Sequence, residues 1–218
     1  MKDIENIPIS FVDLETGGTN PGQDDILEIG IVKVSYPRLY FAGGGGEPEL
    51  IEEVSIKVNP SRPPDPEAAR LNGFDKDVWA KEGKDLIDAL TQCHEVIRQS
   101  RFAAWNFGFD SQFFIQSYNK LGWRWPPFQM SHRMIDVQTL CWPYTLAHFE
   151  NPYKVNQGDI AKKMGLPEAE KTLHRAVVDA HLNRAMYEFI MCRIDVTPPA
   201  NGAVPAGDPS GQRSEKES

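Results

Sequence analysis

The pattern of apolar and polar positions predicts both strands and helices along this chain. Continuous apolar runs bounded by glycine, proline or acidic residues are typical of buried strands. The predicted strands are Ile7 to Leu14, Ile26 to Val34, Val54 to Val58, Phe102 to Trp105 and Met134 to Leu140. Because the paths between the first three are short, we expect these strands to pair antiparallel, with a flexible glycine-containing loop over Tyr36 to Leu50.

Apolar residues at intervals of three and four predict the helices. A short helix begins near Glu67 and stops at Gly73. The longer helices are Lys84 to Gln99, Ser111 to Leu121 and Asn156 to Met164, the last capped by Gly165. A C-terminal helix is indicated by an apolar stripe of Val178, Leu182, Ala185, Met186 and Phe189.

His174 and Asp179 flank the start of this C-terminal helix. If both lay in one helix, five steps of about 100° would leave their side chains roughly 140° apart. They converge only if His174 precedes the helix and Asp179 lies inside it. Asp179 stands at the edge of the apolar stripe, so its carboxylate either faces solvent or points into a polar site beside the core.

Other acidic residues stand at strand ends. Asp13 and Glu15 share one face at the end of the first strand, so they either are solvated turn residues, titrate at higher pH or share a cation. Asp110 stands between the fourth strand and a helix, where a helix N-cap is the simple alternative. Four converging carboxylates suit Mg²⁺ or Mn²⁺, and a pair of such ions stabilises the attacking and leaving oxygens of a phosphodiester. A nearby histidine then suits the role of general base.

Length and composition are typical of one soluble domain with a sizeable core. The chain has 218 residues, of which 40% are apolar, without a secretory signal or an apolar run long enough to cross a membrane. We therefore expect a cytoplasmic protein. From position 197 onward Pro, Gly, Ser and charged residues dominate, which predicts one domain over 1–196 and a disordered tail over 197–218 that could tether a partner.

The charge and the cysteines exclude some alternatives. With a net charge of −8, the chain lacks the broad basic coat of a non-specific duplex-binding protein. Its three cysteines form no Cys-x-x-Cys pair, which argues against disulfides and structural zinc and favours core thiols.

Two local features have open interpretations. The lysines at 154, 162, 163 and 171, together with Arg175, form either a local basic surface or an ordinary solvated face. An aromatic loop with Trp123, Trp125 and Phe128 fits core packing, a lid or base stacking.

Three segments resemble the motifs of the DnaQ-like 3′-5′ exonucleases. Phe-Val-Asp13-Leu-Glu15-Thr-Gly-Gly is similar to the first motif, Asn106-Phe-Gly-Phe-Asp110 to the second, and His174-x4-Asp179 to the third, in the family's order. The resemblance covers residues 7 to 192 and places the chain in the histidine (DEDDh) subclass. It implies an α/β, RNase H-like fold with a mixed five-stranded sheet flanked by helices.

The resemblance also implies roles for individual residues. Asp13, Glu15, Asp110 and Asp179 would hold two Mg²⁺ ions, for which Mn²⁺ would substitute, and His174 would activate water. Leu14, Thr16 and Gly17 would hold the 3′-terminal nucleotide, with Leu71, Asn72 and Asn106 nearby. The expected reaction is release of nucleoside 5′-monophosphates from single-stranded 3′ ends.

The substrate is left open between DNA, slightly favoured, and RNA. Proofreading subunits of bacterial replicases usually carry histidine at the position of Asn72, whereas ribonuclease T carries a similar Phe-Asn-Gly. Trp105 also departs from the histidine or tyrosine that is usual before the motif-two asparagine. A scaffold without activity is the alternative from another class, but the four acids and the histidine that the motifs require are all present.

Overall fold

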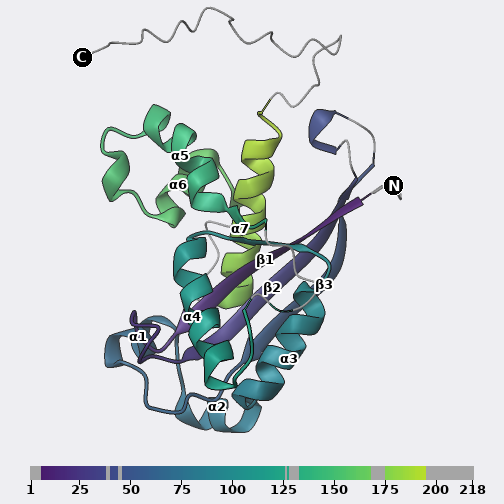
Figure 1. Ribbon diagram of the computed structural model, residues 1–218. Helices are drawn as coiled ribbons and strands as arrows, with labels where there is room; N and C mark the ends of the chain where they lie inside the picture. Colours follow the sequence, from purple (N-terminus) through teal and green to yellow (C-terminus); the bar gives the residue numbers. More distant parts are fainter. Residues whose placement is uncertain are drawn as a thin grey trace, which may run out of the picture.

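The computed structural model describes residues 6–37, 40–43, 46–125, 127, 133–167 and 175–194. Its centre is a five-stranded sheet in the order β3-β2-β1-β4-β5, of which Figure 1 labels β1, β2 and β3. The strands are β1 (Asn6–Thr16), β2 (Ile26–Pro37), β3 (Glu49–Lys57), β4 (Arg101–Ala104) and β5 (Ile135–Asp136). The first three pair antiparallel as predicted, and β4 and β5 extend the sheet in parallel from β1. The predicted mixed five-stranded sheet is therefore confirmed.

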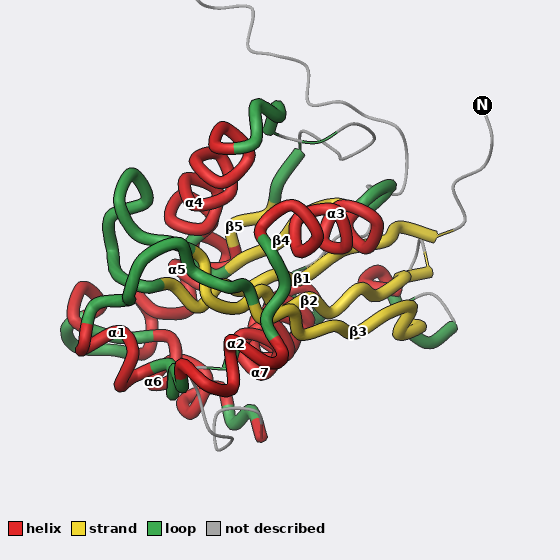
Figure 2. The backbone as a smooth tube through the Cα atoms, turned by 90° about the horizontal axis from the view of Figure 1, so that it is seen from below, coloured by secondary structure: helices red, strands yellow, loops and turns green. Residues whose placement is uncertain are grey.

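Helices cover both faces of this sheet (Figure 2). They are α1 (Pro66–Leu71), α2 (Lys76–Glu82), α3 (Leu86–Ile97), α4 (Phe107–Lys120), α5 (Val137–His148), α6 (Gln157–Met164) and α7 (Ala176–Met191), with short 3-10 turns η1 (Tyr40–Ala42) and η2 (Pro152–Lys154). In Figure 2, α3 and α4 lie on one side of the strands and α7 lies on the other. Within the described ranges, no helix combines the length and apolar character needed to cross a membrane.

Alternation along β1 divides the core into two layers. Val12 and Leu14 face α3 and α4, where they pack with residues such as Phe113. Ile9 and Phe11 face the opposite layer, which is built by α5, α6 and α7. Asp13 and Glu15 continue the second series, so the period of two carries these carboxylates to the face that α7 covers.

The segment Met134 to Leu140 is not the predicted strand. Only Ile135 and Asp136 are extended, and α5 begins at Val137. The side chain of Asp136 accepts a hydrogen bond from the backbone N–H of Thr139 and so caps the new helix. Val137, Cys141 and Thr145 are the buried residues of α5, at helical spacing. A short apolar run fits either a strand or one face of a helix, and here the cap and the spacing of four decide for the helix.

Other sequence expectations have mixed outcomes. Trp125 stacks on Phe114 with ring centroids 4.8 Å apart, so it serves the core. Cys93 and Cys141 are buried as predicted, but Cys192 is exposed. Helix α2 was missed; Asp75 caps its first turn and the indole of Trp79 anchors it to the carbonyl of Leu27. Phe128 and the tail over 197–218 lie outside the described residues.

Candidate active site

The first two carboxylates lie at the end of β1. In the antiparallel pairing of β1 with β2, Asp13 stands opposite Gly30 and Glu15 opposite Glu28. A Cβ atom on Gly30 would lie only 2.0 Å from the backbone carbonyl carbon of Ala176, the first residue of α7. The absence of a side chain at Gly30 therefore lets the start of α7 rest directly on the sheet, beside Asp13.

This close approach brings the third carboxylate into place. Asp179 lies in the first turn of α7, where its backbone N–H donates to the carbonyl of Arg175 at 3.1 Å. Asp179 is buried, and ligand oxygens of Asp13, Glu15 and Asp179 lie within 4.8 Å of one another. The prediction that Asp179 lies inside a helix and points to a polar site is thus confirmed, and the three carboxylates could hold a metal ion.

Asp110 approaches from the opposite layer. It is buried in the first turn of α4, four residues after the N-cap Asn106, so it is not itself the cap. The backbone N–H of Leu14 donates to its carboxylate, which ties Asp110 to the strand between Asp13 and Glu15. Among the neighbouring acids, its charge also raises the pKa of Asp13 the most. The structure therefore brings the four predicted acids to one end of β1.

The carboxylates destabilise one another's charged forms. Burial, followed by the charges of Asp110, Asp179 and Glu15, raises the pKa of Asp13 well above its usual value. Burial and then the charge of Asp179 raise the pKa of Glu15 to about 8. Burial likewise raises the pKa of Asp110 to about 7, against the hydrogen bonds from backbone amides that lower it. Such a cluster is relieved by protons or by cations.

Neutral amide side chains from α7 and α6 support the cluster. The Asn183 side chain donates to the carbonyl of Val12 at 3.4 Å and also bonds Asp13, which lowers the pKa of that carboxyl in part. Gln157 donates from Nε2 to Oδ1 of Asn183 at 2.7 Å. Sequence reasoning missed both residues, because an amide in a helix has no pattern that separates a surface position from a buried one.

A fifth carboxylate, also missed, underlies the start of α7. Glu28 is fully buried on β2 and accepts a hydrogen bond from Ser55 Oγ at 2.5 Å. Its second oxygen lies 3.5 Å from Nε of Arg175, the residue before α7. Since Arg175 also accepts the first backbone hydrogen bonds of that helix, this ion pair fixes the segment that carries Asp179. Arg175, which the sequence placed in a basic surface, is therefore paired with the buried Glu28.

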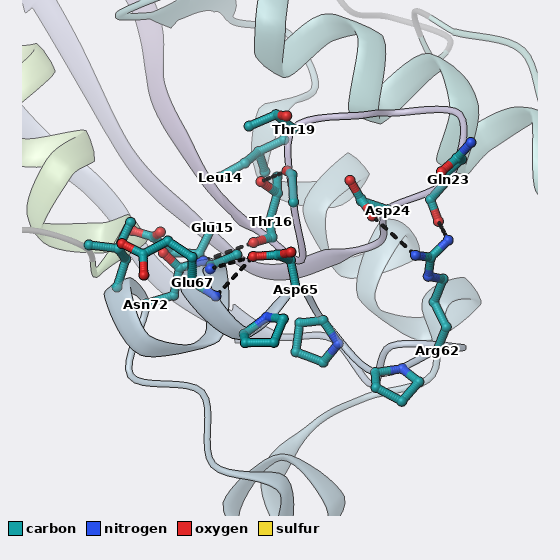
Figure 3. A pocket seen from close by; sticks show the side chains of 16 residues that line it. Leu14, Glu15, Thr16, Thr19, Gln23, Asp24, Arg62, Asp65, Glu67 and Asn72 are labelled. Atoms are coloured by element: carbon teal, nitrogen blue, oxygen red, sulfur yellow. Dashed lines mark hydrogen bonds and ion pairs between the residues drawn. The ribbon is translucent and has the colours of Figure 1, made fainter.

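Two cavities meet at Leu14 and Glu15. One of about 420 Å³ is lined by Asp13, Leu14, Glu15, Asn156, Gln157, Gly158 and Asp179. The other, of about 760 Å³, extends from Glu15 to the proline-rich segment before α1 and includes Thr16, Leu71 and Asn72 (Figure 3). Asn72 donates from Nδ2 to the carbonyl of Thr16 at 2.9 Å, which docks the end of α1 against β1.

Most predicted substrate contacts border this second cavity. Leu14, Thr16, Leu71 and Asn72 line it. Gly17 follows Thr16, and its backbone N–H donates to the carbonyl of Asp25 while its carbonyl accepts from the N–H of Asp65. Asn106 is exposed at the start of α4 and lines neither cavity. His174 lies outside the described residues, immediately before Arg175 in the sequence.

The sequence model of the RNase T exonuclease family matches residues 10–187. The chain belongs to this exonuclease family. The match spans all three motifs and confirms the resemblance to the DEDDh group of 3′-5′ exonucleases. No curated protein sequence matches the chain.

Solved structures share the fold of this exonuclease. The zinc-bound form of the E. coli exonuclease I complex with single-stranded DNA superposes with a TM-score of 0.66 at 18% identity, covering 86% of this chain and 41% of that one. E. coli exonuclease I with a dT13 oligonucleotide gives a TM-score of 0.63 at 16% identity, covering 84% and 41%. This exonuclease therefore spans about two fifths of the length of those chains and shares their RNase H-like architecture.

Proposed function

We propose that this exonuclease removes nucleotides one at a time from the 3′ end of single-stranded nucleic acid, with DNA as the preferred substrate. The observation that carries the proposal is the convergence of Asp13, Glu15 and Asp179 within 4.8 Å, with Asp110 tied to Leu14 beside them. This arrangement gathers four oxygen-bearing acids in a site that opens to a cavity.

The donor set fits a pair of divalent cations such as Mg²⁺, with Mn²⁺ as a substitute. All four donors are hard carboxylate oxygens, and burial together with neighbouring carboxylates raises the pKa values of Asp13, Glu15 and Asp110, which is the environment that a bound cation relieves. Such ions, when bound, stabilise the charge that develops on the attacking and leaving oxygens. Asp13, Glu15, Asp110 and Asp179 would hold them, while Asn183 and Gln157 keep Asp13 oriented.

The larger cavity suits the terminal nucleotide. Leu14 and Leu71 supply apolar surface for a base, whereas Asp24, Asp65 and Glu67 make much of the remaining wall acidic. Among the described residues that line it, Arg62 is the one cation, and it lies 3.6 Å from Asp24 (Figure 3). A strand that continued through this cavity would bring further phosphates against these acids, so the charge favours a chain end there.

His174 is proposed as the general base. A ring nitrogen of neutral His174 would accept a proton from the attacking water, a role that histidine side chains commonly fill near neutral pH. The ion pair between Glu28 and Arg175 anchors the residue that follows it. The preference for DNA is supported by the exonuclease I structures of similar fold, which hold single-stranded DNA.

The experiment compares matched DNA and RNA oligonucleotides labelled at the 5′ end. We expect a ladder that shortens from the 3′ end with Mg²⁺ or Mn²⁺, is abolished by EDTA, and releases nucleoside 5′-monophosphates that chromatography identifies. An oligonucleotide blocked at its 3′ hydroxyl by a bulky group, and the Asp179→Asn variant, are the controls.

The outcomes separate the alternatives. Faster shortening of DNA supports the proposal as stated, and faster shortening of RNA would reassign the enzyme to RNA trimming. Internal cuts would contradict the exonuclease mode. If neither polymer shortens with either metal, a scaffold that only binds nucleic acid becomes the better description.

A further inference from the structure

An exposed aromatic patch lies on the outer side of α5 and η2. Tyr153 is 85% exposed, and its ring lies 5.5 Å from that of Trp142, which is itself 36% exposed. Leu146, one helical turn after Trp142, is 52% exposed. Neighbouring large apolar side chains that remain exposed are typical of binding surfaces. Their exposure to water is unfavourable, so covering them with a ligand stabilises the complex.

The backbone connects this patch to the active site. Tyr153 lies three residues before Asn156, and Asn156, Gln157 and Gly158 line the cavity that contains Asp13 and Asp179. Three residues of extended chain span at most about 11 Å, so the Cα atom of Tyr153 lies within that distance of the cavity wall. The hydrogen bond of Gln157 with Asn183 holds this wall in place.

Packing keeps the patch in a fixed position. Helices α5 and α6 contact each other, and both contact α7, beside which they lie in Figure 1. The hydroxyl of Tyr144 on α5 donates to the carbonyl of Lys163 on α6 at 3.0 Å. Trp142 and Tyr153 are therefore presented by the same rigid group of helices that carries Asp179 and one wall of the catalytic cavity.

The charge of this region differs from that of the rest of the chain. Between 137 and 167 the three lysines at 154, 162 and 163 stand against Glu150 and Asp159, a net charge of +1, so the rest of the chain carries −9 to reach the total of −8. All three lysines are exposed. An exposed aromatic pair beside a lysine, here Lys154 directly after Tyr153, is the combination that binds the bases and the backbone of single strands.

We propose that Trp142, Tyr153 and Lys154 form a stacking platform for single-stranded nucleic acid on the 5′ side of the reacting bond. The proposal rests on the proposed function, because it takes the strand that enters the catalytic cavity as its ligand. Bases about three or more nucleotides from the 3′ end would stack on the two rings, since stacked nucleotides advance by about 3.4 Å. Stacking on these rings involves no hydrogen bonds to the edges of the bases, so the platform would bind strands of any sequence.

The test measures affinity as a function of strand length. All proteins carry Asp179→Asn so that the strand stays intact, and fluorescence anisotropy gives the Kd for oligothymidylates of three, six, nine and twelve nucleotides. We expect Tyr153→Ala to raise the Kd of the longest strand about 10-fold, and the ratio to fall toward one for the trimer. Tyr153→Phe, which keeps the ring, should retain the parental affinity within about 2-fold.

A matched control separates stacking from loss of apolar surface. Ile87 on α3 is 49% exposed, and Ile87→Ala should leave every Kd unchanged. The platform is wrong if Tyr153→Ala binds all lengths like the parent, if Tyr153→Phe is as weak as Tyr153→Ala, or if the variants change only the oligomeric state in gel filtration. These binding results test only the platform. The proposed function is tested separately: it holds if the wild-type protein shortens DNA with Mg²⁺, and it is overturned if the protein does not.

Discussion

Glu15 and Asp110 are acids whose charged forms the folded protein disfavours without a cation. The pKa of Glu15 rises from 4.5 to about 8, and that of Asp110 from 3.8 to about 7. Between the unfolded and folded pKa values, the folded state holds more protons than the unfolded state. Its stability without metal must therefore fall as the pH rises through this window.

This linkage gives a prediction for thermal unfolding. In EDTA, the melting temperature should decrease from pH 5 to pH 8, as Glu15 and Asp110 lose their protons. Saturating Mg²⁺ should raise it by about 5 °C or more at pH 8 and by much less at pH 5, where protons compete for the carboxylates. Differential scanning calorimetry checks both trends, and an Mg²⁺ effect that is independent of pH would contradict the assignment of these acids as ligands.

An isosteric substitution of Asp179 tests whether its carboxylate belongs to the metal site. Asp179→Asn keeps the shape of the side chain but removes one of the three converging charges. We expect kcat/KM to fall at least about 100-fold, because several kcal/mol of transition-state stabilisation depend on the bound cations. The melting temperature in EDTA should stay the same or rise, since one source of repulsion is gone.

A matched substitution controls for the loss of a negative charge as such. Asp88 lies in the first turn of α3 and is exposed, so Asp88→Asn removes a helical carboxylate outside the acidic cluster. Its kcat/KM should remain within about 2-fold of the wild type. Full activity of Asp179→Asn would exclude Asp179 from the site.

The four acids could be predicted from the sequence, but their supports could not. Asp13 and Glu15 follow an apolar strand whose period fixes their face, and Asp179 follows from the geometry of a helix start. Asn183 and Glu28 are fully buried, and although Glu28 lies within the apolar run Ile26 to Val34, no sequence pattern indicates the partner of either residue. Their partners, Gln157 and Arg175, come from other elements, so these contacts arise only from tertiary packing.

At the scale of elements, the site depends on how closely α7 approaches the sheet. Gly30→Ala would place a methyl group 2.0 Å from the backbone of Ala176, where no flexible side chain can yield. We expect the start of α7 to move away from β2, destabilising the fold by about 1–3 kcal/mol and displacing Asp179 from Asp13. Urea unfolding and kcat/KM measure the two effects.

Gly108 provides the comparison for this substitution. A Cβ atom there would have its nearest neighbour at 3.7 Å, which is an ordinary contact, and the residue lies in α4. Gly108→Ala should leave stability unchanged or raise it by up to about 1 kcal/mol, as alanine does in helices. If Gly30→Ala is as stable and as active as the wild type, the close approach does not position Asp179.

Element prediction succeeded where helical spacing ended at a clear stop signal and failed where an apolar run fitted both a strand and a helix. The apolar spacing of α6 and the glycine after it predicted both this helix and its end. Gly165 adopts the left-handed conformation typical of a glycine that ends a helix. The run from Met134 to Leu140 was too short to separate strand from helix, and the cap at Asp136 decides it. Helix α2 depends on Trp79 reaching the carbonyl of Leu27, a contact distant in sequence.

At the scale of the whole molecule, charge is distributed unevenly around the path proposed for the strand. The net charge is −8, and acids line the cavity for the chain end, whereas the region around η2 carries a net positive charge. Bound cations would supply positive charge at the reacting phosphate, so the protein itself needs few lysines near the strand. Affinity should then come mainly from stacking and from the cations rather than from a basic surface.

The salt dependence of binding tests this distribution of charge. Each phosphate that a lysine neutralises on a single strand adds about −0.7 to the slope of log K against log salt concentration. With two or three such contacts, we expect a slope of about −2 for a twelve-nucleotide strand bound to Asp179→Asn protein. Lys154→Gln should make the slope less steep by about 0.7, whereas Lys81→Gln on α2, far along the chain from η2, should not change it. A slope of about −5 or steeper would contradict this distribution. It would mean that a broad basic surface elsewhere on the molecule supplies most of the affinity, despite the acidic composition.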